Sequence, residues 1–346
     1  MEQLWLWVAF NVLVLAFLAL DLFVFHREAH ELRIREAAIW SAVWVGLALL
    51  FNYGVYRFLG TQRALEFLTG YLIEKALSVD NIFVFVLIFA YFRVPLRYQH
   101  RVLFWGILGA LALRGAMIAS GVYLIERFHW VIYVFGAFLV VTAVRMAFED
   151  ETDIEPEANP ILRLLRRLLP ITPGYRGPRF FVREPDPADG RGRLRRYATP
   201  LFVVLVMVET TDLVFALDSI PAIFAVTRDP FLIYTSNVFA ILGLRAMYFL
   251  LAAIIELFHY LRLGLSAVLA FVGAKMLLSE VYDIPIGASL GVVASLLAVS
   301  IGASLLFPKK AEEHAPVIHN PLARAPDAEP PLAAPDPPAE PAAGAE

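Results

Sequence analysis

The sequence contains no cysteine among its 346 residues. This absence excludes disulfide bonds, thiolate metal sites and cysteine nucleophiles, so any metal ion must be bound through oxygen or imidazole ligands. Charge is also scarce, because 18% of the residues are charged whereas 60% are hydrophobic. Soluble domains have about half apolar and about a quarter charged residues. The composition therefore predicts a protein with a large surface in contact with lipid.

Apolar runs of about 20 residues recur along the chain, and this is the length that a helix needs to cross the hydrocarbon core of a bilayer. They predict an all-α polytopic membrane protein with about nine transmembrane helices. No positive charge precedes the first run, which is long enough to span, so we expect it to be an anchor and not a cleaved signal. The predicted spans are residues 4–25, 37–58, 64–92, 102–125, 128–148, 199–226, 232–257, 264–280 and 284–307.

An acidic motif occurs twice, in the third and sixth predicted spans. One copy reads Glu74-Lys-Ala-Leu-Ser-Val-Asp-Asn-Ile82 and the other reads Asp212-Leu-Val-Phe-Ala-Leu-Asp-Ser-Ile220. A Leu-Arg pair and a Gly-Ala pair also recur in the spans that follow each copy. The repeat unit is three helices, an odd number, so the second copy enters the membrane from the opposite side. Inverted repeats of this kind are typical of transporters that alternate access around a midplane site.

The repeat and the polar segments divide the chain into six predicted parts. The long central loop has an acidic beginning and an arginine-rich second part that can lie as an amphipathic helix on the membrane surface. The tail is too rich in Pro and Ala to bury a core, and we expect it to be disordered. The parts are 1–60 (two N-terminal transmembrane helices), 61–148 (first three-helix repeat), 149–198 (cytoplasmic loop), 199–281 (second three-helix repeat), 282–307 (last transmembrane helix) and 308–346 (cytoplasmic tail).

Ionisable and amide side chains lie near the middle of the predicted spans. An aspartate at the bilayer centre costs about 2.5–3.5 kcal/mol on insertion scales, so such residues face a protected interior and indicate a functional site. Four intramembrane cations are predicted to pair with the acids or to gate the site: Lys75, Arg114, Arg245 and Lys275. The predicted metal ligands are Glu74, Asp80, Asn81, Glu209, Asp212, Asp218, Ser219 and Asn237.

The spacing within each motif restricts which side chains can meet. The first acid and the small polar residue are seven apart and share a helix face. Asp80 and Asp218 follow the first acid by six residues, which is about 240° around a regular helix. Convergence of all the acids on one cavity therefore requires local unwinding near 78–80 and 217–221. Pro221 favours this, because it cannot donate a hydrogen bond to residue 217.

At these residues the chain resembles the TerC family, which is named for tellurium resistance, and within it the Alx-like branch. The resemblance is carried by Glu74–Asn81 and Glu209–Ala222, is supported by Asp21–Arg27 and Ser236–Arg245, and covers most of residues 15–280. It implies a fold related to the LysE-type exporters and, for Alx-like members, efflux of Mn²⁺. It also implies that the family's acidic positions correspond to Glu74, Asp80, Glu209, Asp212 and Asp218.

Oxygen donors without cysteine, and without histidine in the core of the spans, suit Mn²⁺, Mg²⁺ or Ca²⁺. We therefore expect a transporter that exports a divalent cation, with Mn²⁺ as the favoured substrate. We expect no covalently bound cofactor and no enzymatic activity. Its expected partners are the lipid bilayer and the metal ion, and not nucleic acid. The alternative is a membrane stress-resistance or assembly factor, of the tellurite-resistance type, whose buried acids form a salt-bridge network. An intramembrane aspartyl protease is less favoured, because neither motif contains Gly-x-Gly-Asp.

The distribution of Lys and Arg predicts the orientation in the bacterial inner membrane. One set of loops, together with the two lysines at the beginning of the tail, carries nineteen of these residues, and the opposite set carries four. By the positive-inside rule this places the N-terminus outside and the C-terminus in the cytoplasm. Topology reporters fused at Asp189 and at Glu346 should both report a cytoplasmic location. A periplasmic signal at either position would contradict both the orientation and the inversion of the repeat.

Overall fold

The computed structural model describes residues 2–23, 34–148, 160–185, 194–252, 260–282 and 284–307. Ten helices form the bundle in this part of the chain, and a short helix and two strands lie in the loop after α5. The bundle helices are α1 (Glu2–Phe23), α2 (Ile34–Leu59), α3 (Thr61–Tyr91), α4 (Leu96–Arg127), α5 (Val131–Phe148), α7 (Pro200–Phe224), α8 (Pro230–Leu242), α9 (Leu244–Leu251), α10 (Leu261–Leu277) and α11 (Ile286–Leu306). The loop elements are α6 (Pro160–Leu168), β1 (Phe181–Pro185) and β2 (Leu194–Ala198).

Proline marks the beginning of four helices in the bundle. Pro200 and Pro230 occupy the first turns of α7 and α8, and Pro95 and Pro285 directly precede α4 and α11. Proline suits these positions because its missing N–H would have no helical partner there. The runs between the prolines are apolar, and in lipid they must satisfy their backbone hydrogen bonds internally, which favours a helix.

Five helices are long and apolar enough to cross a membrane among the residues that the structure describes, and a sixth span results if α8 and α9 count as one. These two helices meet at Gly243 with a bend of 43°. Each of the nine predicted ranges overlaps a helix or this bent pair. The number of nine transmembrane spans remains a prediction, because the other helices do not meet the length and composition that define these six.

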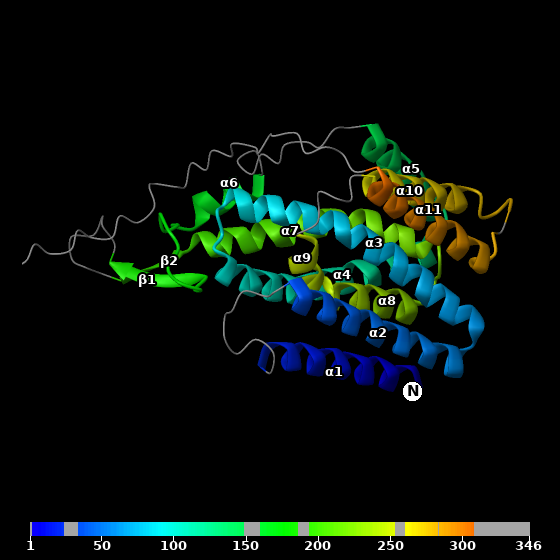
Figure 1. Cartoon of the computed structure of the whole chain (residues 1–346), viewed down its shortest axis with the longest axis horizontal. Coiled ribbons are helices and arrows are strands. Elements are labelled where there is room, and N and C mark those ends of the chain that lie inside the picture. Colours follow the sequence, from blue (N-terminus) through cyan, green and yellow to red (C-terminus); the bar gives the residue numbers. More distant parts are fainter. Residues whose placement is uncertain are drawn as a thin grey trace, which may run out of the picture.

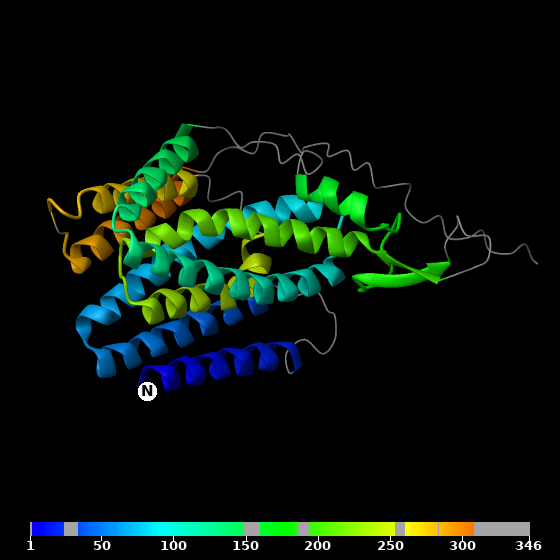
Figure 2. The ribbon, with the colours of Figure 1, turned by 180° about the vertical axis from the view of Figure 1, so that it is seen from behind.

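The helices form three groups in the views of Figures 1 and 2. α5, α10 and α11 lie together on one side, α1 and α2 lie on the opposite side, and α3, α4, α7 and α8 lie between them. The two helices that carry the acidic motif, α3 and α7, contact each other in this central group. The motif therefore lies where neighbouring helices cover it from several directions.

The loop after α5 contains a feature that the all-α prediction missed. β1 and β2 form an antiparallel two-stranded sheet in which Phe181 pairs with Ala198. The predicted amphipathic helix is present as α6, and it contacts α7. The Tyr175 hydroxyl donates a hydrogen bond of 2.8 Å to the Phe92 carbonyl after α3, and burial raises the pKa of Tyr175. The predicted acidic run from 149 and the predicted disordered tail lie outside the described residues.

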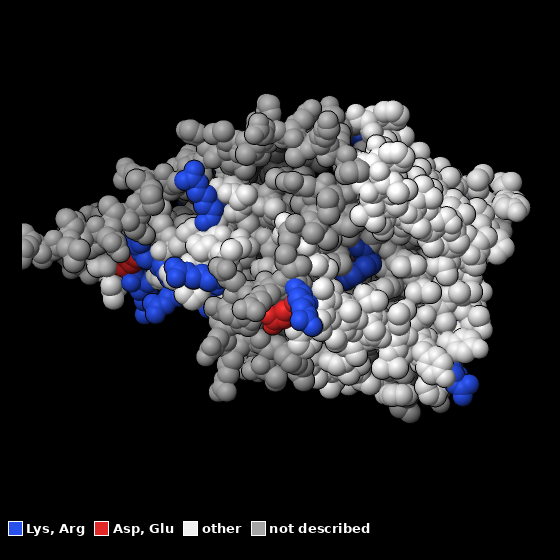
Figure 3. All heavy atoms as spheres, in the orientation of Figure 1, with Lys and Arg blue, Asp and Glu red and all other residues white. Residues whose placement is uncertain are grey.

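Charged side chains are unevenly distributed over the surface shown in Figure 3. In Figure 3 the Lys and Arg side chains are seen mainly toward the end that bears the β-hairpin, and the helical flank at the other end is almost entirely uncharged. Large apolar side chains on the helices are exposed on that surface, as expected for helices that face lipid.

The two corresponding glycines of the predicted repeat lie against each other where α5 and α10 pack. A Cβ atom added at Gly273 would lie 2.8 Å from the Gly136 carbonyl oxygen, and one at Gly136 would lie 3.1 Å from the Gly273 carbonyl oxygen. Small residues at such positions let helix backbones approach closely in a membrane. The close packing of α5 on α10 therefore depends on both glycines.

Gly273→Ala should destabilise the protein by about 1–3 kcal/mol, because the backbones must separate to admit the methyl group. The melting temperature of purified protein in detergent measures this effect. Gly291→Ala is a matched control, because a Cβ at Gly291 in α11 meets nothing within 4 Å. An equal effect of the two substitutions would contradict the packing argument.

Candidate functional site

Arg114, in the middle of α4, is the centre of a buried ion-pair network. Its Nε and Nη2 atoms donate to the two oxygens of Asp212 in α7, at 3.1 and 2.9 Å. Its Nη1 atom donates to Glu74 Oε1 in α3. All three side chains are at most 5% exposed. One arginine thus joins the first acid of the first motif to the first acid of the second.

Two further predicted residues complete this site. Arg114 Nη1 lies 3.3 Å from Ser219 Oγ and 3.4 Å from Asn237 Oδ1. Ser219 is seven residues after Asp212, and the prediction that these two share a helix face is confirmed. Asn237 lies on α8, so the site is built by α3, α4, α7 and α8. Glu74 Oε2 and Asn237 Nδ2 are buried and have no hydrogen-bond partner among the described residues.

The second acid of each motif lies in a different place. Asp80 and Asp218 line one cavity of about 300 Å³, together with Asn81. Asp218 Oδ1 accepts a hydrogen bond of 3.1 Å from Thr142 Oγ1 in α5. Arg145, one turn further along α5, also lines this cavity. Two carboxylates, an amide, a hydroxyl and the Arg145 guanidinium therefore surround one space.

The predicted unwinding of the motif is wrong. α3 continues through residues 78–80, and α7 continues through 217–221 with Pro221 inside the helix. Because both helices stay regular, the 240° offset between the two acids of each motif is kept. The structure therefore forms two pairs of equivalent acids at two places, Glu74 with Asp212 and Asp80 with Asp218, and not one cavity with all four.

Glu209 lies one turn before Asp212 in α7 but does not hydrogen-bond to Arg114 within the described chain. Its carboxylate packs against Gly109 of α4, so closely that a Cβ atom at Gly109 would clash with it. Its Oε2 atom is buried without a hydrogen-bond partner in the described ranges. Gly109 is thus the residue that makes room for this carboxylate.

The four predicted cations have separate locations. Arg114 makes the ion pairs with Glu74 and Asp212 that are described above. The Lys75 ammonium donates to the Ala240 carbonyl at 3.3 Å. Arg245 is buried in the first turn of α9. Lys275 donates to Ser289 Oγ at 2.9 Å and lines a cavity at one end of the bundle, not the site around Arg114.

The capacity of these residues to hold a metal ion depends on rearrangement. Among the described residues, no three Asp, Glu or His side chains are close enough together to hold one. The predicted metal ligands therefore stay a prediction. Thr142 and Arg145 were missed by sequence reasoning, although Arg145 is an ionisable residue near the end of a predicted span and could have been considered.

Comparison with known proteins gives one family and several close relatives. The family described as "Integral membrane protein TerC family" matches residues 59–312. The chain is 55% identical over 306 residues to an uncharacterized membrane protein of Myxococcus xanthus, covering 88% of this chain and 93% of the relative. It is 49% identical over 304 residues to the "Putative membrane-bound redox modulator Alx" of Escherichia coli K12, covering 85% and 92%. No solved structure matches the chain.

Arg114→Gln should reduce the amount of folded protein, because it leaves Glu74 and Asp212 buried without their cation. Breaking a buried ion pair in this way costs about 3–5 kcal/mol. Membrane abundance and melting temperature measure the loss, and Arg97→Gln, an exposed arginine at the beginning of the same helix, is the control. Adding Glu74→Gln and Asp212→Asn to Arg114→Gln should restore abundance. Normal stability of the single variant would show that the network is not structurally important.

Proposed function

Because the chain belongs to the TerC family and is a multi-pass integral membrane protein, we propose that it exports a divalent metal cation, with Mn²⁺ as the expected ion. The observation that carries this proposal is the pairing in space of carboxylates that are repeated in the sequence. Glu74 and Asp212 share Arg114, and Asp80 and Asp218 line one cavity. Acidic side chains within membrane-spanning helices are costly to bury, and in membrane proteins they usually mark a functional site.

The donor set fits a hard cation. Carboxylate, amide and hydroxyl oxygens are the ligands of Mn²⁺, Mg²⁺ and Ca²⁺ in proteins. The cavity between Asp80 and Asp218 offers these groups in a space of about 300 Å³. It is the proposed entry site for the ion, because its two carboxylates already face a common cavity.

Arg114 has the role of an internal counter-ion in this proposal. The group of Glu74, Asp212 and Arg114 carries two negative charges and one positive charge, so it attracts a further cation. An incoming divalent ion competes with the guanidinium for the oxygens of Asp212, and it can also bind the Oε2 atom of Glu74, which has no partner among the described residues. Movement of Arg114 away from the acids would then accompany binding.

The proposed transport cycle uses the two repeats in opposite orientations. If α3, α4 and α5 correspond to α7, α8–α9 and α10, the contact of α3 with α8 corresponds to that of α7 with α4. The contact of α5 with α7 likewise corresponds to that of α10 with α3, and all four contacts occur. This exchange is the pattern expected of two repeats related by a two-fold axis. We propose that the repeats are inverted in a nine-span protein, with the N-terminus outside the bacterial inner membrane and the C-terminus in the cytoplasm, as the loop charges predict.

A second candidate function is that of a membrane stress or assembly factor, and the Arg114 network favours it. Arg114 joins three helices through buried ion pairs, as a purely structural tie would. The name of the Escherichia coli relative refers to redox modulation. Thiol chemistry cannot supply such a role in these 346 residues, because they contain no cysteine. We favour transport, because buried ion pairs are poor stabilisers and a structural role does not explain the second pair of acids.

Asp80→Asn and Asp218→Asn should each abolish manganese tolerance and raise cellular Mn²⁺, while the protein still accumulates in the membrane. Asparagine keeps the shape of aspartate, removes one ligand charge and is cheaper to bury. The two measurements, membrane abundance and cellular Mn²⁺ content, are made on the same strains. Glu126→Gln, an exposed acid at the end of α4, is the control and should retain export.

The outcomes separate the two candidate functions. Normal abundance with lost tolerance supports the transport site. Lost abundance that is restored by a compensating cation substitution, such as Arg145→Gln, supports a structural network and contradicts transport through this cavity. Unchanged cellular Mn²⁺ in all variants would contradict manganese export.

A further inference from the structure

The two helices that carry the repeated Leu-Arg pair differ in one respect. α4 is continuous through Leu113 and Arg114, whereas α8 ends at Leu242 and α9 begins at Leu244, directly before Arg245. The two helices meet with a bend of 43° (Figure 1). The interruption therefore lies at the arginine that corresponds to Arg114 in the proposed repeat.

The local sequence does not require this bend. Sharp bends in helices usually occur at proline, at Gly/Ser pairs or at bulges, and no proline follows Pro230 up to the end of α9. Gly243 has φ −82° and ψ −3°, a right-handed conformation close to that of a helix. A helix can therefore continue through Gly243 at the modest cost of one glycine. Contacts with other helices must hold the bend.

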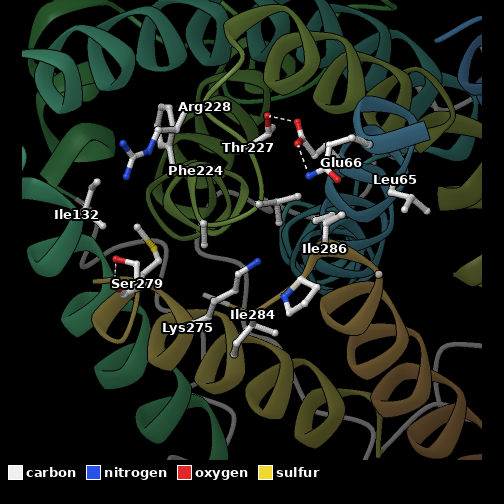
Figure 4. Close-up of a pocket in the computed structure, with 16 residues that line it drawn as sticks. Leu65, Glu66, Ile132, Phe224, Thr227, Arg228, Lys275, Ser279, Ile284 and Ile286 are labelled. Atoms are coloured by element: carbon white, nitrogen blue, oxygen red, sulfur yellow. Dashed lines mark hydrogen bonds between the residues drawn. The ribbon is translucent and has the colours of Figure 1, made fainter. Parts of the chain in front are cut away.

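The beginning of α8 is fixed to the beginning of α3. Thr227 Oγ1, just before α8, donates a hydrogen bond of 2.7 Å to Glu66 Oε2 in α3, as Figure 4 shows. Asp229 Oδ1 accepts a hydrogen bond of 3.0 Å from the Phe231 N–H, which caps the start of α8. Because this end is held, a change of conformation at Gly243 moves α9 and leaves the start of α8 in place.

Two polar contacts stabilise the bent arrangement. The Lys75 ammonium donates to the Ala240 carbonyl in the last turn of α8 at 3.3 Å, and a cation is favoured at a helix C-terminus. In a continuous helix this carbonyl would accept the Leu244 N–H, so the lysine stabilises the interruption. The Tyr248 hydroxyl of α9 donates at 2.9 Å to Gln99 Oε1 near the beginning of α4. Both of these side chains are buried, so α9 cannot leave its place without giving up their hydrogen bond.

Gly243 brings the end of α8 and the start of α9 close to α3. A Cβ atom added at Gly243 would lie 2.8 Å from Lys75 Nζ and 3.1 Å from Trp44 Cβ in α2. Arg245 follows two residues later and is 4% exposed. Because Lys75 directly follows Glu74 and both α8 and α9 contact α3, the interruption lies beside the part of α3 that carries the first acid of the motif.

We propose that α9 pivots at Gly243 and brings Arg245 to the Glu74 carboxylate. By exchange of the two repeats, the contact of Arg114 with Asp212 corresponds to a contact of Arg245 with Glu74. Glu74 Oε2 is buried, has no hydrogen-bond partner among the described residues and can accept this contact. In the pivoted position α9 continues the line of α8, as the two halves of α4 already do around Arg114.

The movement changes the charge of the acid pair. Glu74, Asp212 and Arg114 together carry one negative charge, which attracts a cation, and the arrival of Arg245 makes the group neutral. A neutral group no longer attracts a cation by its net charge. This role of Arg245 rests on the proposed transport of a divalent cation, because it provides the step that releases the ion.

Distances between two spin labels test this movement in the purified full-length chain. The chain has no cysteine, so Phe58→Cys at the end of α2 and Ala252→Cys directly after α9 supply the only two labelling sites. Both residues are exposed. Double electron–electron resonance should resolve two distances, one for each position of α9. Lys75→Met and Tyr248→Phe should each raise the ratio of the second distance to the first by about two- to tenfold, as expected for the loss of one hydrogen bond.

Arg245→Gln separates the role of the arginine from a simple loosening of α9. In the Lys75→Met protein it should remove most of the second distance, because an amide cannot form the ion pair with Glu74 that stabilises the pivoted helix. In proteoliposomes it should lower the maximal rate of Mn²⁺ transport by about tenfold or more, without raising the Mn²⁺ concentration that gives the half-maximal rate. A second distance that persists after Arg245→Gln would overturn the assignment of Arg245.

Tyr123→Phe is the matched control, because it removes a hydroxyl from an exposed tyrosine of α4 and should leave both distances unchanged. Tyr248→Phe removes only one hydroxyl and keeps the test available if Lys75→Met does not accumulate. One unchanged distance in all variants, or an equal effect of Tyr123→Phe, would overturn the movement of α9. Two distances that respond as expected in a protein that does not transport Mn²⁺ would support the movement and contradict the proposed function.

Discussion

The bidentate contact of Arg114 with Asp212, extended to Glu74, is the interaction on which the interior of this protein depends. A charge buried among apolar helices is tolerated only when it is paired and hydrogen-bonded. Arg114 satisfies two acids at once, and its α4 therefore cannot move relative to α3 and α7 without exposing a charge to apolar surroundings. Ser219 and Asn237 surround the same guanidinium, so α8 belongs to the same unit.

The regularity of α3 and α7 explains why the chain has two acidic places and not one. In an unbroken helix, residues six apart point in different directions, and neither helix is interrupted at its motif. The first acids therefore face the bundle interior and Arg114, whereas the second acids face the cavity beside α5. A cation entering beside Asp80 and Asp218 would be one helix face away from the Arg114 network. In the transport proposal, this separation links an entry site to an internal counter-ion whose displacement can be coupled to the movement of helices.

Close backbone packing and two cavities with ionisable side chains on their walls lie on the side of the molecule that contains α5 and α10. Gly136 and Gly273 bring the backbones of α5 and α10 together. The cavity with Asp218 opens beside the second half of α5, and the cavity with Lys275 opens beside the last turn of α10. The two cavities therefore lie at different positions along α5, one beside Ile132 and the other beside Thr142 and Arg145. The cavity with Asp218 is also lined by Asp80 and Arg145, and the cavity with Lys275 is also lined by Glu66 and Arg228.

Local chemistry along the chain determined the helices, the approximate ends of the predicted spans and the identity of the buried acids. Apolar length and proline position act over a few residues, and a repeated motif is visible without any knowledge of contacts. The hairpin was not predicted, because this loop was interpreted from its acidic and arginine-rich composition. The strands flank an Asp189-Gly190 pair, a dipeptide typical of hairpin turns, which could have indicated it. Only the tertiary structure decided that Arg114 binds both first acids, that Lys275 lies in a different cavity, and that Pro221 does not unwind α7. These outcomes depend on which helices become neighbours, and residues 74, 114 and 212 come together only because α3, α4 and α7 pack side by side.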